Sequence, residues 1–127
     1  MKLEIKNGKL IYYKEFDLND DIDLSHSKIN YLPDNLQVGG DIDLSNTNID
    51  VLSENLQVGG DINLSNTEIS SLPENLQVGR NLNLSYTKIK VLPDNLQVKG
   101  IIDLSNIKIK KENIPKCLLK KCFGYEE

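Results

Sequence analysis

One phrase recurs along the chain at a fixed interval. NLQVGGDIDLSNT is followed by NLQVGGDINLSNT, NLQVGRNLNLSYT and NLQVKGIIDLSNI, at residues 35–47, 55–67, 75–87 and 95–107. The interval is 20 residues and is kept without a slip from Ile22 to Ile109. A repeat of this length is too short to fold alone and is typical of a solenoid, in which each turn packs on the next.

Within each repeat, apolar and polar residues alternate as they do in a half-buried strand. In GDIDLS, Ile42 and Leu44 point to one side while Asp41 and Asp43 point to the other. Stacked turns, called rungs below, bring equivalent apolar residues into columns. The predicted core columns are Ile22, Ile42, Ile62, Leu82, Ile102; Leu24, Leu44, Leu64, Leu84, Leu104; Ile29, Ile49, Ile69, Ile89, Ile109; Leu32, Leu52, Leu72, Leu92; Leu36, Leu56, Leu76, Leu96; and Val38, Val58, Val78, Val98.

The segment GDIDLSNTNI resembles the core of a leucine-rich repeat, L-x-x-L-x-L-x-x-N-x-L, with Ile42, Leu44 and Ile49 on the apolar positions. Thr47 stands where that family usually has Asn. The fuller phrase LPxNLxVGGxLxLSxTxI is similar to short repeats from bacterial and bacteriophage genomes. The resemblance covers residues 18–110, about five rungs. It implies a parallel sheet on the concave side, with extended or turn-like backbone on the convex side.

We expect residues 1–127 to form one domain, a β-rich solenoid with a cap at each end. Asn7-Gly8 separates two strand-like segments, which predicts a type I′ hairpin in an N-terminal cap at 1–17. A degenerate half-rung should follow, because three apolar residues fall one period before the core columns. They are Tyr12, Phe16 and Leu18.

The solenoid at 18–110 should end in a C-terminal cap at 111–127. Pro115 is placed to begin a short helix. Leu118 and Leu119 would then cover the apolar columns of the last rung, which otherwise remain open to aggregation.

Acidic and basic residues are segregated along the chain. Residues 16–79 hold twelve acidic residues and one basic residue, Lys28, which is a net charge of −11. Residues 80–121 hold ten basic and three acidic residues, which is a net charge of +7. This polarity bears on partners and association rather than on the fold.

The sequence carries no membrane or secretion signal. No apolar run approaches the roughly 18–20 residues that a membrane span needs. MKLEIKNGKL has no apolar stretch after its charges, unlike a signal peptide. Cys117 and Cys122 match no C-x-x-C pattern. We therefore expect a cytoplasmic protein with free thiols.

Several polar letters do not vary, and we expect them to serve the fold rather than a site. Side-chain amides stacked in register can form hydrogen bonds to their own turn and to the turn of the next rung. The two unvarying amide columns are Asn35, Asn55, Asn75, Asn95 and Gln37, Gln57, Gln77, Gln97. Thr47 and its equivalents should satisfy backbone groups inside the turn. Gly40 and its equivalents should allow the bend into the strand.

The residues that point outward from the strands do vary, in columns with rungs about 4.8 Å apart. The columns are Asp21, Asp41, Asp61, Asn81, Ile101; Asp23, Asp43, Asn63, Asn83, Asp103; Ser25, Ser45, Ser65, Ser85, Ser105; and His26, Asn46, Asn66, Tyr86, Asn106. Like charges on neighbouring strands destabilise a sheet. A solvated face, a face for a basic partner and a divalent-metal site all remain open.

We predict partner contacts at Asp21, Asp23, Asp41, Asp43, Asp61, Asn63, Asn83 and Tyr86. We assign no metal and no cofactor, because calcium-binding β-rolls place Asp in turns of a nine-residue period and this chain does not. Lysines flank the last two rungs at Lys88, Lys90, Lys108, Lys110 and Lys111. This patch lacks interleaved aromatic residues, so nucleic acid is not the expected partner. The caps should obstruct end-on stacking, so we expect a monomer.

Catalysis has little support, because His26 is the only histidine and no clear triad accompanies it. We therefore expect no enzyme. The expected function is a protein-binding module that recognises a partner, with a basic surface, through the polar, acidic concave face. Two alternatives remain open. One is an inhibitor, including a phage-encoded anti-defence product, that blocks a basic groove of a host enzyme. The other is a passive structural repeat.

Overall fold

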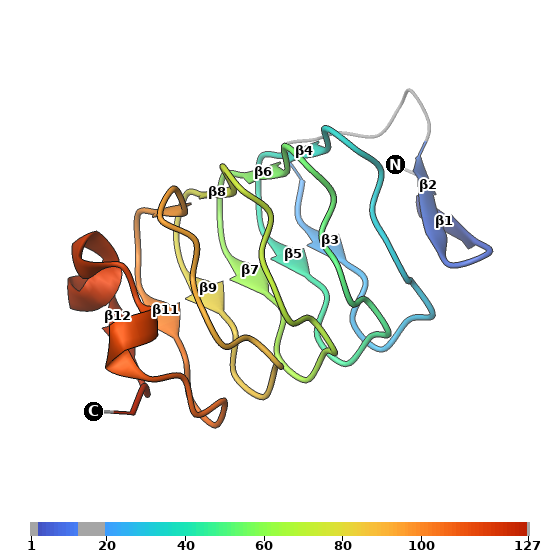
Figure 1. Cartoon of the computed structure of the whole chain (residues 1–127). Coiled ribbons are helices and arrows are strands. Elements are labelled where there is room, and N and C mark those ends of the chain that lie inside the picture. Colours follow the sequence, from blue (N-terminus) through green and yellow to red (C-terminus); the bar gives the residue numbers. More distant parts are fainter. Residues whose placement is uncertain (1–2, 13–19, 127) are drawn as a thin grey trace.

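The computed structural model describes residues 3–12 and 20–126 and forms a β-solenoid of about five turns (Figure 1). The predicted β-rich solenoid with an N-terminal hairpin is confirmed. The elements are β1 Leu3–Lys6, β2 Lys9–Tyr12, β3 Ile22–Asp23, β4 Gln37–Val38, β5 Ile42–Asp43, β6 Gln57–Val58, β7 Ile62–Asn63, β8 Gln77–Val78, β9 Leu82–Asn83, β10 Gln97–Val98, β11 Ile102–Asp103, the 3-10 helices η1 Lys111–Asn113 and η2 Lys116–Lys121, and β12 Cys122–Phe123.

The main sheet is parallel and has six strands in the order β12-β11-β9-β7-β5-β3. Its register follows the repeat, since Ile22 pairs with Ile42 and Ile42 pairs with Ile62. Backbone hydrogen bonds extend the pairing past the strand ends, as when the Leu44 N–H donates to the Asn63 carbonyl at 2.8 Å. Equivalent residues are therefore stacked one rung apart, as predicted.

A second parallel sheet, which the sequence analysis did not predict, has four strands in the order β10-β8-β6-β4. Each of its strands is a Gln-Val pair. A left-handed residue precedes three of these pairs, such as Asn35 with φ 61°, and a bend at Gly39-Gly40 follows the first. Two residues between turns are too few to give a readable alternation, which is why the pattern was missed.

The core lies between the two sheets and the extended segment of each rung. Every residue of the six predicted apolar columns is buried, and the most exposed of them, Leu72, shows 8% of its surface. Leu10, Ile114 and Leu118 close the ends of this core from the caps. The prediction of the core is therefore confirmed.

The threonine column serves the turn, as predicted. The hydroxyl of Thr47 donates to the Leu44 carbonyl at 2.7 Å, and the hydroxyl of Thr67 donates to the Leu64 carbonyl at 2.8 Å. Thr87 repeats the bond on the fourth rung. In the first rung Ser27 takes this position, and its buried hydroxyl has no partner among the described residues.

The N-terminal hairpin has the predicted type I′ turn, because Asn7 and Gly8 have φ of 54° and 80°. The Gly8 carbonyl accepts the N–H groups of Asn30 at 2.6 Å and Tyr31 at 3.2 Å, which fixes the hairpin to the first rung. Of the predicted half-rung, Phe16 and Leu18 lie outside the described residues.

The C-terminal cap differs from the expected single helix. Two short 3-10 helices are present, and Pro115 immediately precedes the second of them. The chain then adds β12 as a sixth parallel strand, pairing Cys122 with Ile102 and Phe123 with Asp103. These pairs again lie 20 residues apart. The 20-residue spacing of the strands thus continues through the cap, although the amino-acid sequence of the repeat does not.

Candidate functional site

The predicted contact residues occupy the outer side of the six-stranded sheet. Its register stacks Asp23, Asp43, Asn63 and Asn83 into one column. Asp21, Asp41 and Asp61 each lie one residue before a strand and form the neighbouring column. Tyr86 lies in the turn after β9. The structure therefore brings together the two predicted Asp columns.

The first of these columns bonds each rung to the next. Oδ1 of Asp21 accepts the N–H of Asp41 at 2.8 Å, and Oδ1 of Asp41 accepts the N–H of Asp61 at 2.7 Å. Asp61 and Asn81 continue the ladder at 2.9 Å each, the last bond ending on the N–H of Ile101. These carboxylates therefore have a structural role that the sequence analysis did not foresee.

Glycine stands beside this ladder at positions 40, 60 and 100, where the side chain of the preceding rung fills the space that a Cβ would take. Arg80 has the equivalent position on the fourth rung, and the bond from the Asn81 N–H to Oδ1 of Asp61 is kept at 2.9 Å. A Cβ on Gly40 would overlap Oδ1 of Asp21, and a Cβ on Gly60 would overlap Oδ1 of Asp41. Neither glycine has a positive φ. The predicted bend is present, and glycine at positions 40 and 60 permits a close approach rather than a positive φ.

The second column bonds within its own rung. Oδ1 of Asp43 accepts both the N–H of Ser45 at 2.9 Å and its hydroxyl at 2.6 Å. Asp23 makes the same pair of bonds to Ser25, and these bonds lower the pKa of the Asp23 carboxyl. Asn63 repeats the arrangement with its amide oxygen. The unvarying serine column thus exists to bond the Asp or Asn two residues before it.

Asp and Asn are equivalent to the scaffold but not to a partner. Both supply the Oδ1 acceptor, and in the described residues these bonds use Oδ1 alone. The second atom is a carboxylate oxygen in Asp and an amino group in Asn. Exchanging the two therefore changes the charge of the face while the fold keeps its bond. The assignment of these residues as partner contacts stays a prediction.

A trough runs along the face between the two columns. One hollow of about 320 Å³ lies at its N-terminal part and includes Asp21 and Asp43 in its walls. A second hollow of about 250 Å³ reaches Ile101 and Phe123. Asp61 and Asn63 line both hollows, so the two are adjacent along the face. Phe123 was missed as part of the face, although its interval of 20 residues from Asp103 is readable in the sequence.

The column that contains Tyr86 has a backbone reason for its composition. His26, Asn46, Asn66, Tyr86 and Asn106 all have φ between 57° and 63°. Asn and His adopt this left-handed conformation several-fold more often than most residues, whereas a bulky aromatic residue does so rarely. The Tyr86 side chain is also 57% exposed. Tyrosine here therefore costs stability without adding to the core.

We expect Tyr86→Asn to raise the free energy of unfolding by about 0.5–1 kcal/mol, because Asn relieves the left-handed strain. Equilibrium urea unfolding measures the change. Asn66→Ala is the matched variant at the same position of the third rung and should be destabilising. A loss of stability in Tyr86→Asn would show that the ring makes contacts that outweigh its backbone strain.

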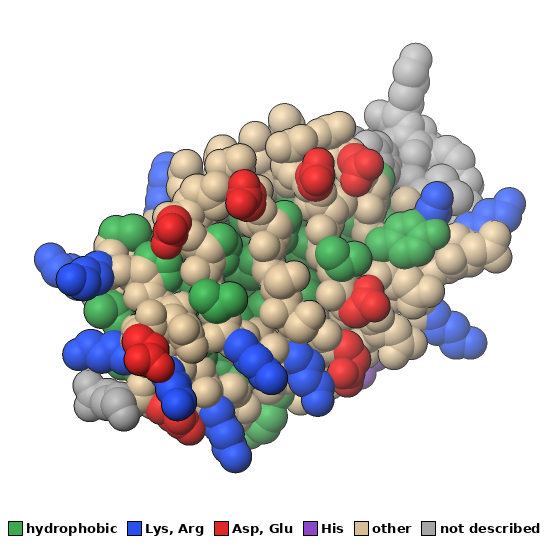
Figure 2. Space-filling view, viewed as in Figure 1, with side chains coloured by type: hydrophobic (Ala, Val, Ile, Leu, Met, Phe, Trp, Pro, Cys, Tyr) green, Lys and Arg blue, Asp and Glu red, His purple; other side chains and the backbone are tan. Residues whose placement is uncertain are grey.

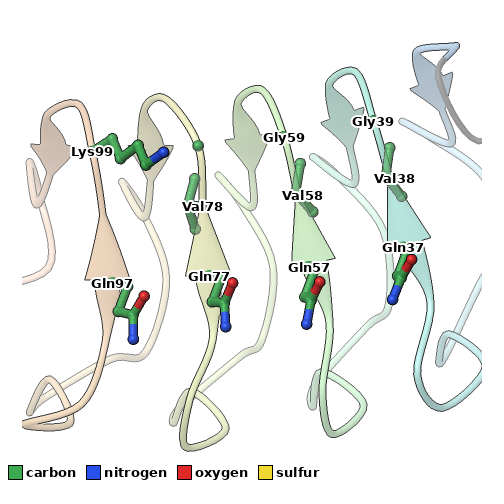
Figure 3. A pocket seen from close by; sticks show the side chains of 11 residues that line it. Gln37, Val38, Gly39, Gln57, Val58, Gly59, Gln77, Val78, Gln97 and Lys99 are labelled. Carbon is green, nitrogen blue, oxygen red and sulfur yellow. The ribbon is translucent and has the colours of Figure 1, made fainter.

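The four-stranded sheet carries a different surface, a groove of about 440 Å³ (Figure 3). Gln37, Gln57, Gln77 and Gln97 line it, and Figure 3 shows their side chains parallel to one another. The predicted amide ladder forms in part: the Asn55 amide donates to the Asn35 amide oxygen at 2.9 Å, and Oδ1 of Asn95 accepts the backbone N–H of Asn75 at 3.1 Å. Among the residues with described placement, the glutamine side chains make no such bond. This groove has little charge and offers no distinctive chemistry.

Charged side chains gather elsewhere on the molecule. Lysine and arginine side chains cluster at the lower left of Figure 2, on the last rungs, and a row of acidic side chains follows the upper edge. An exposed acidic residue precedes each strand of the four-stranded sheet at the same position, namely Asp34, Glu54, Glu74 and Asp94. This acidic ridge is separate from the trough, because it lies in the turn that leads into the second sheet.

Residues suited to metals or covalent chemistry are not brought together in residues 3–12 and 20–126. No group of three or more His, Cys, Asp or Glu side chains there is placed to hold a metal ion. Burial raises the pKa of the Cys122 thiol to about 11, which disfavours the thiolate that a nucleophile requires. Within the same residues, no helix is both long and apolar enough to cross a membrane.

Comparisons with family models, curated proteins and solved structures find no match to this chain. The architecture itself shows a repeat solenoid with a 20-residue spacing. Because one fold supports many functions, function has to be argued from the site.

Proposed function

We propose that the chain is a leucine-rich-repeat protein of the short bacterial or bacteriophage type. The stacked parallel strands at a 20-residue spacing support this assignment. The inward positions Ile42, Leu44 and Ile49 of the repeat phrase are all buried, as that family's pattern requires. Thr47, which replaces the family's usual Asn, makes the bond to a turn carbonyl that the position calls for.

The proposed activity is non-catalytic binding of a protein that has a basic surface, through the trough face of the six-stranded sheet. One observation carries the proposal: the scaffold holds Oδ1 of each aspartate on this face, and among the described residues it makes no hydrogen bond to Oδ2. Oδ1 of Asp41 and of Asp43 is held at 2.7 Å and 2.6 Å by neighbouring groups. An array of acceptors that is already ordered loses little side-chain entropy on binding.

The charge of the face favours this kind of partner. Asp21, Asp41, Asp61, Asp23 and Asp43 place five carboxylates on the first three rungs. Acidic groups at such density steer a basic protein toward the face and set its orientation, and salt weakens that attraction. The like-charge repulsion between rungs is offset in part by the bonds to backbone amides.

The test is a pulldown from bacterial lysate with the tagged chain and two variants of equal charge. The face variant is Asp41→Asn, Asp43→Asn, Asp61→Asn, which keeps every Oδ1 bond. The ridge variant is Asp34→Asn, Glu54→Gln, Glu74→Gln, which removes three charges from the separate acidic ridge. We expect a protein that binds the parent and the ridge variant, is released by high salt and is lost from the face variant.

Capture that is equal in all three proteins would contradict the proposal, as would loss from the ridge variant alone. Loss from both variants would show that net charge, rather than the trough face, governs binding. If a captured protein is an enzyme, its activity in the complex decides between the two functions left open. Lost activity identifies an inhibitor, and retained activity identifies a recognition module.

A further inference from the structure

The trough is lined mainly by carboxylates at one end, and at the other end it has two exposed apolar side chains beside Asp103. Its first wall runs Asp21, Asp41, Asp61, Asn81, Ile101, and its second wall runs Asp23, Asp43, Asn63, Asn83, Asp103, Phe123. The two apolar residues at the far end are Ile101, which is 51% exposed, and Phe123, which is 44% exposed. They line the same hollow, so β12 adds a second apolar side chain, Phe123, to the one that the fifth rung supplies as Ile101.

The width of the trough limits what can lie in it. Its walls are two residues apart along each strand, which is roughly 7 Å. An α-helix with side chains is about 10–12 Å across and would rest on the rims rather than enter. A single extended chain is narrower, since neighbouring strands lie only about 4.8 Å apart in a sheet, and can lie along the trough with its backbone near the aspartate side chains.

The length of the trough limits the segment that fills it. Six strands at about 4.8 Å spacing extend over about 24 Å from β3 to β12. An extended chain covers that distance with about seven residues. The wall residues then determine the order of residue types in the bound segment. Its cationic side chains lie over Asp21 to Asp61, and an apolar side chain lies against Ile101 and Phe123.

We propose that the trough binds an extended segment of about seven residues in a partner protein, in which lysine or arginine residues are separated from an apolar anchor at the opposite end. This inference rests on the proposed function and names the partner segment. The apolar hollow contributes affinity that does not depend on salt, because burying an aliphatic or aromatic side chain is favourable at any ionic strength. The carboxylates contribute the salt-dependent part.

The experiment uses the full chain and two fluorescein-labelled peptides, KKSKSLF and KKSKSAA, in anisotropy titrations at low and high salt. We expect KKSKSLF to bind at least about tenfold more tightly than KKSKSAA. The variant Ile101→Asn, Phe123→Asn should remove that difference. Asparagine is what the fourth rung has in both walls, as Asn81 and Asn83, so the scaffold should accept it. Circular dichroism confirms that the variant is folded.

Equal affinity for the two peptides, no binding of either peptide, or a preference that survives in the double Asn variant would each overturn the inference. The aspartate face variant should weaken both peptides alike. If the pulldown partner still requires the aspartates while the two peptides bind equally, the proposed function stands and this inference fails. If the partner does not require the aspartates, the proposed function itself fails.

Discussion

Leu64→Ala should lower the free energy of unfolding by about 3 kcal/mol and the melting temperature by about 10 °C. Leu64 lies on the central rung with none of its surface exposed, and it is stacked between Leu44 and Leu84. Truncation leaves a cavity that cannot close, because the rungs above and below are fixed by backbone hydrogen bonds on both sides. Urea unfolding and a thermal melt by circular dichroism measure the loss.

Glu68→Ala is the matched control, since Glu68 is exposed on the same rung. It should change the free energy of unfolding by less than about 0.5 kcal/mol. A cost for Leu64→Ala no greater than that of Glu68→Ala would show that the rungs adjust to fill the space, and that the core is less tightly specified than its burial indicates.

The second large effect on stability is expected when the aspartates lose their Oδ1 acceptor, and it can be distinguished from the effect of losing only their charge. Asp41→Ala, Asp61→Ala removes two inter-rung acceptors and leaves the N–H groups of Asp61 and Asn81 without their partners. We expect this variant to lose about 2–4 kcal/mol of stability, as lost charge-assisted hydrogen bonds do. Urea unfolding at neutral pH measures it.

Asp41→Asn, Asp61→Asn should remain within about 1 kcal/mol of the parent, since the amide oxygen keeps the bond and the removal of charge relieves repulsion along the column. The paired result matters more than either value alone. If the Asn and Ala variants were equally unstable, charge rather than the Oδ1 acceptor would hold the ladder. The Asn exchange would then no longer be a clean test of partner binding.

The repeat interval determined most of the fold in advance. Once Ile22, Ile42 and Ile62 stand at equal intervals with alternating polarity, parallel in-register stacking is the arrangement that buries all of them. The hairpin at Asn7-Gly8 was predictable for a local reason, because both residues tolerate the positive φ of a type I′ turn. Signals that depend only on period and on local backbone preference could therefore be read directly.

The missed features depend on contacts between rungs. The bond from Asp21 to the N–H of Asp41 exists only once the stack has formed, so the sequence shows an acidic column but not its purpose. The sixth strand was hidden because 3-10 helices replace the repeat letters between Ile109 and Cys122. The partner segment is beyond prediction from letters alone, since the trough depends on walls supplied by six separate strands.

The inter-rung ladder also bears on how such a chain can grow. Each of the first four rungs offers an Oδ1 acceptor to the following rung, and each of the second to fifth donates an N–H to the preceding one, so a duplicate of an inner rung inserts with its bonding already complete. Every duplication would lengthen the trough by about 4.8 Å. Later exchange of aspartate for asparagine would alter what the added length recognises without refolding the chain. Duplication of a rung thus depends on the Oδ1 atom of the Asp or Asn side chain. Divergence of recognition depends on the second atom of the same side chain, an oxygen in Asp and an amino group in Asn.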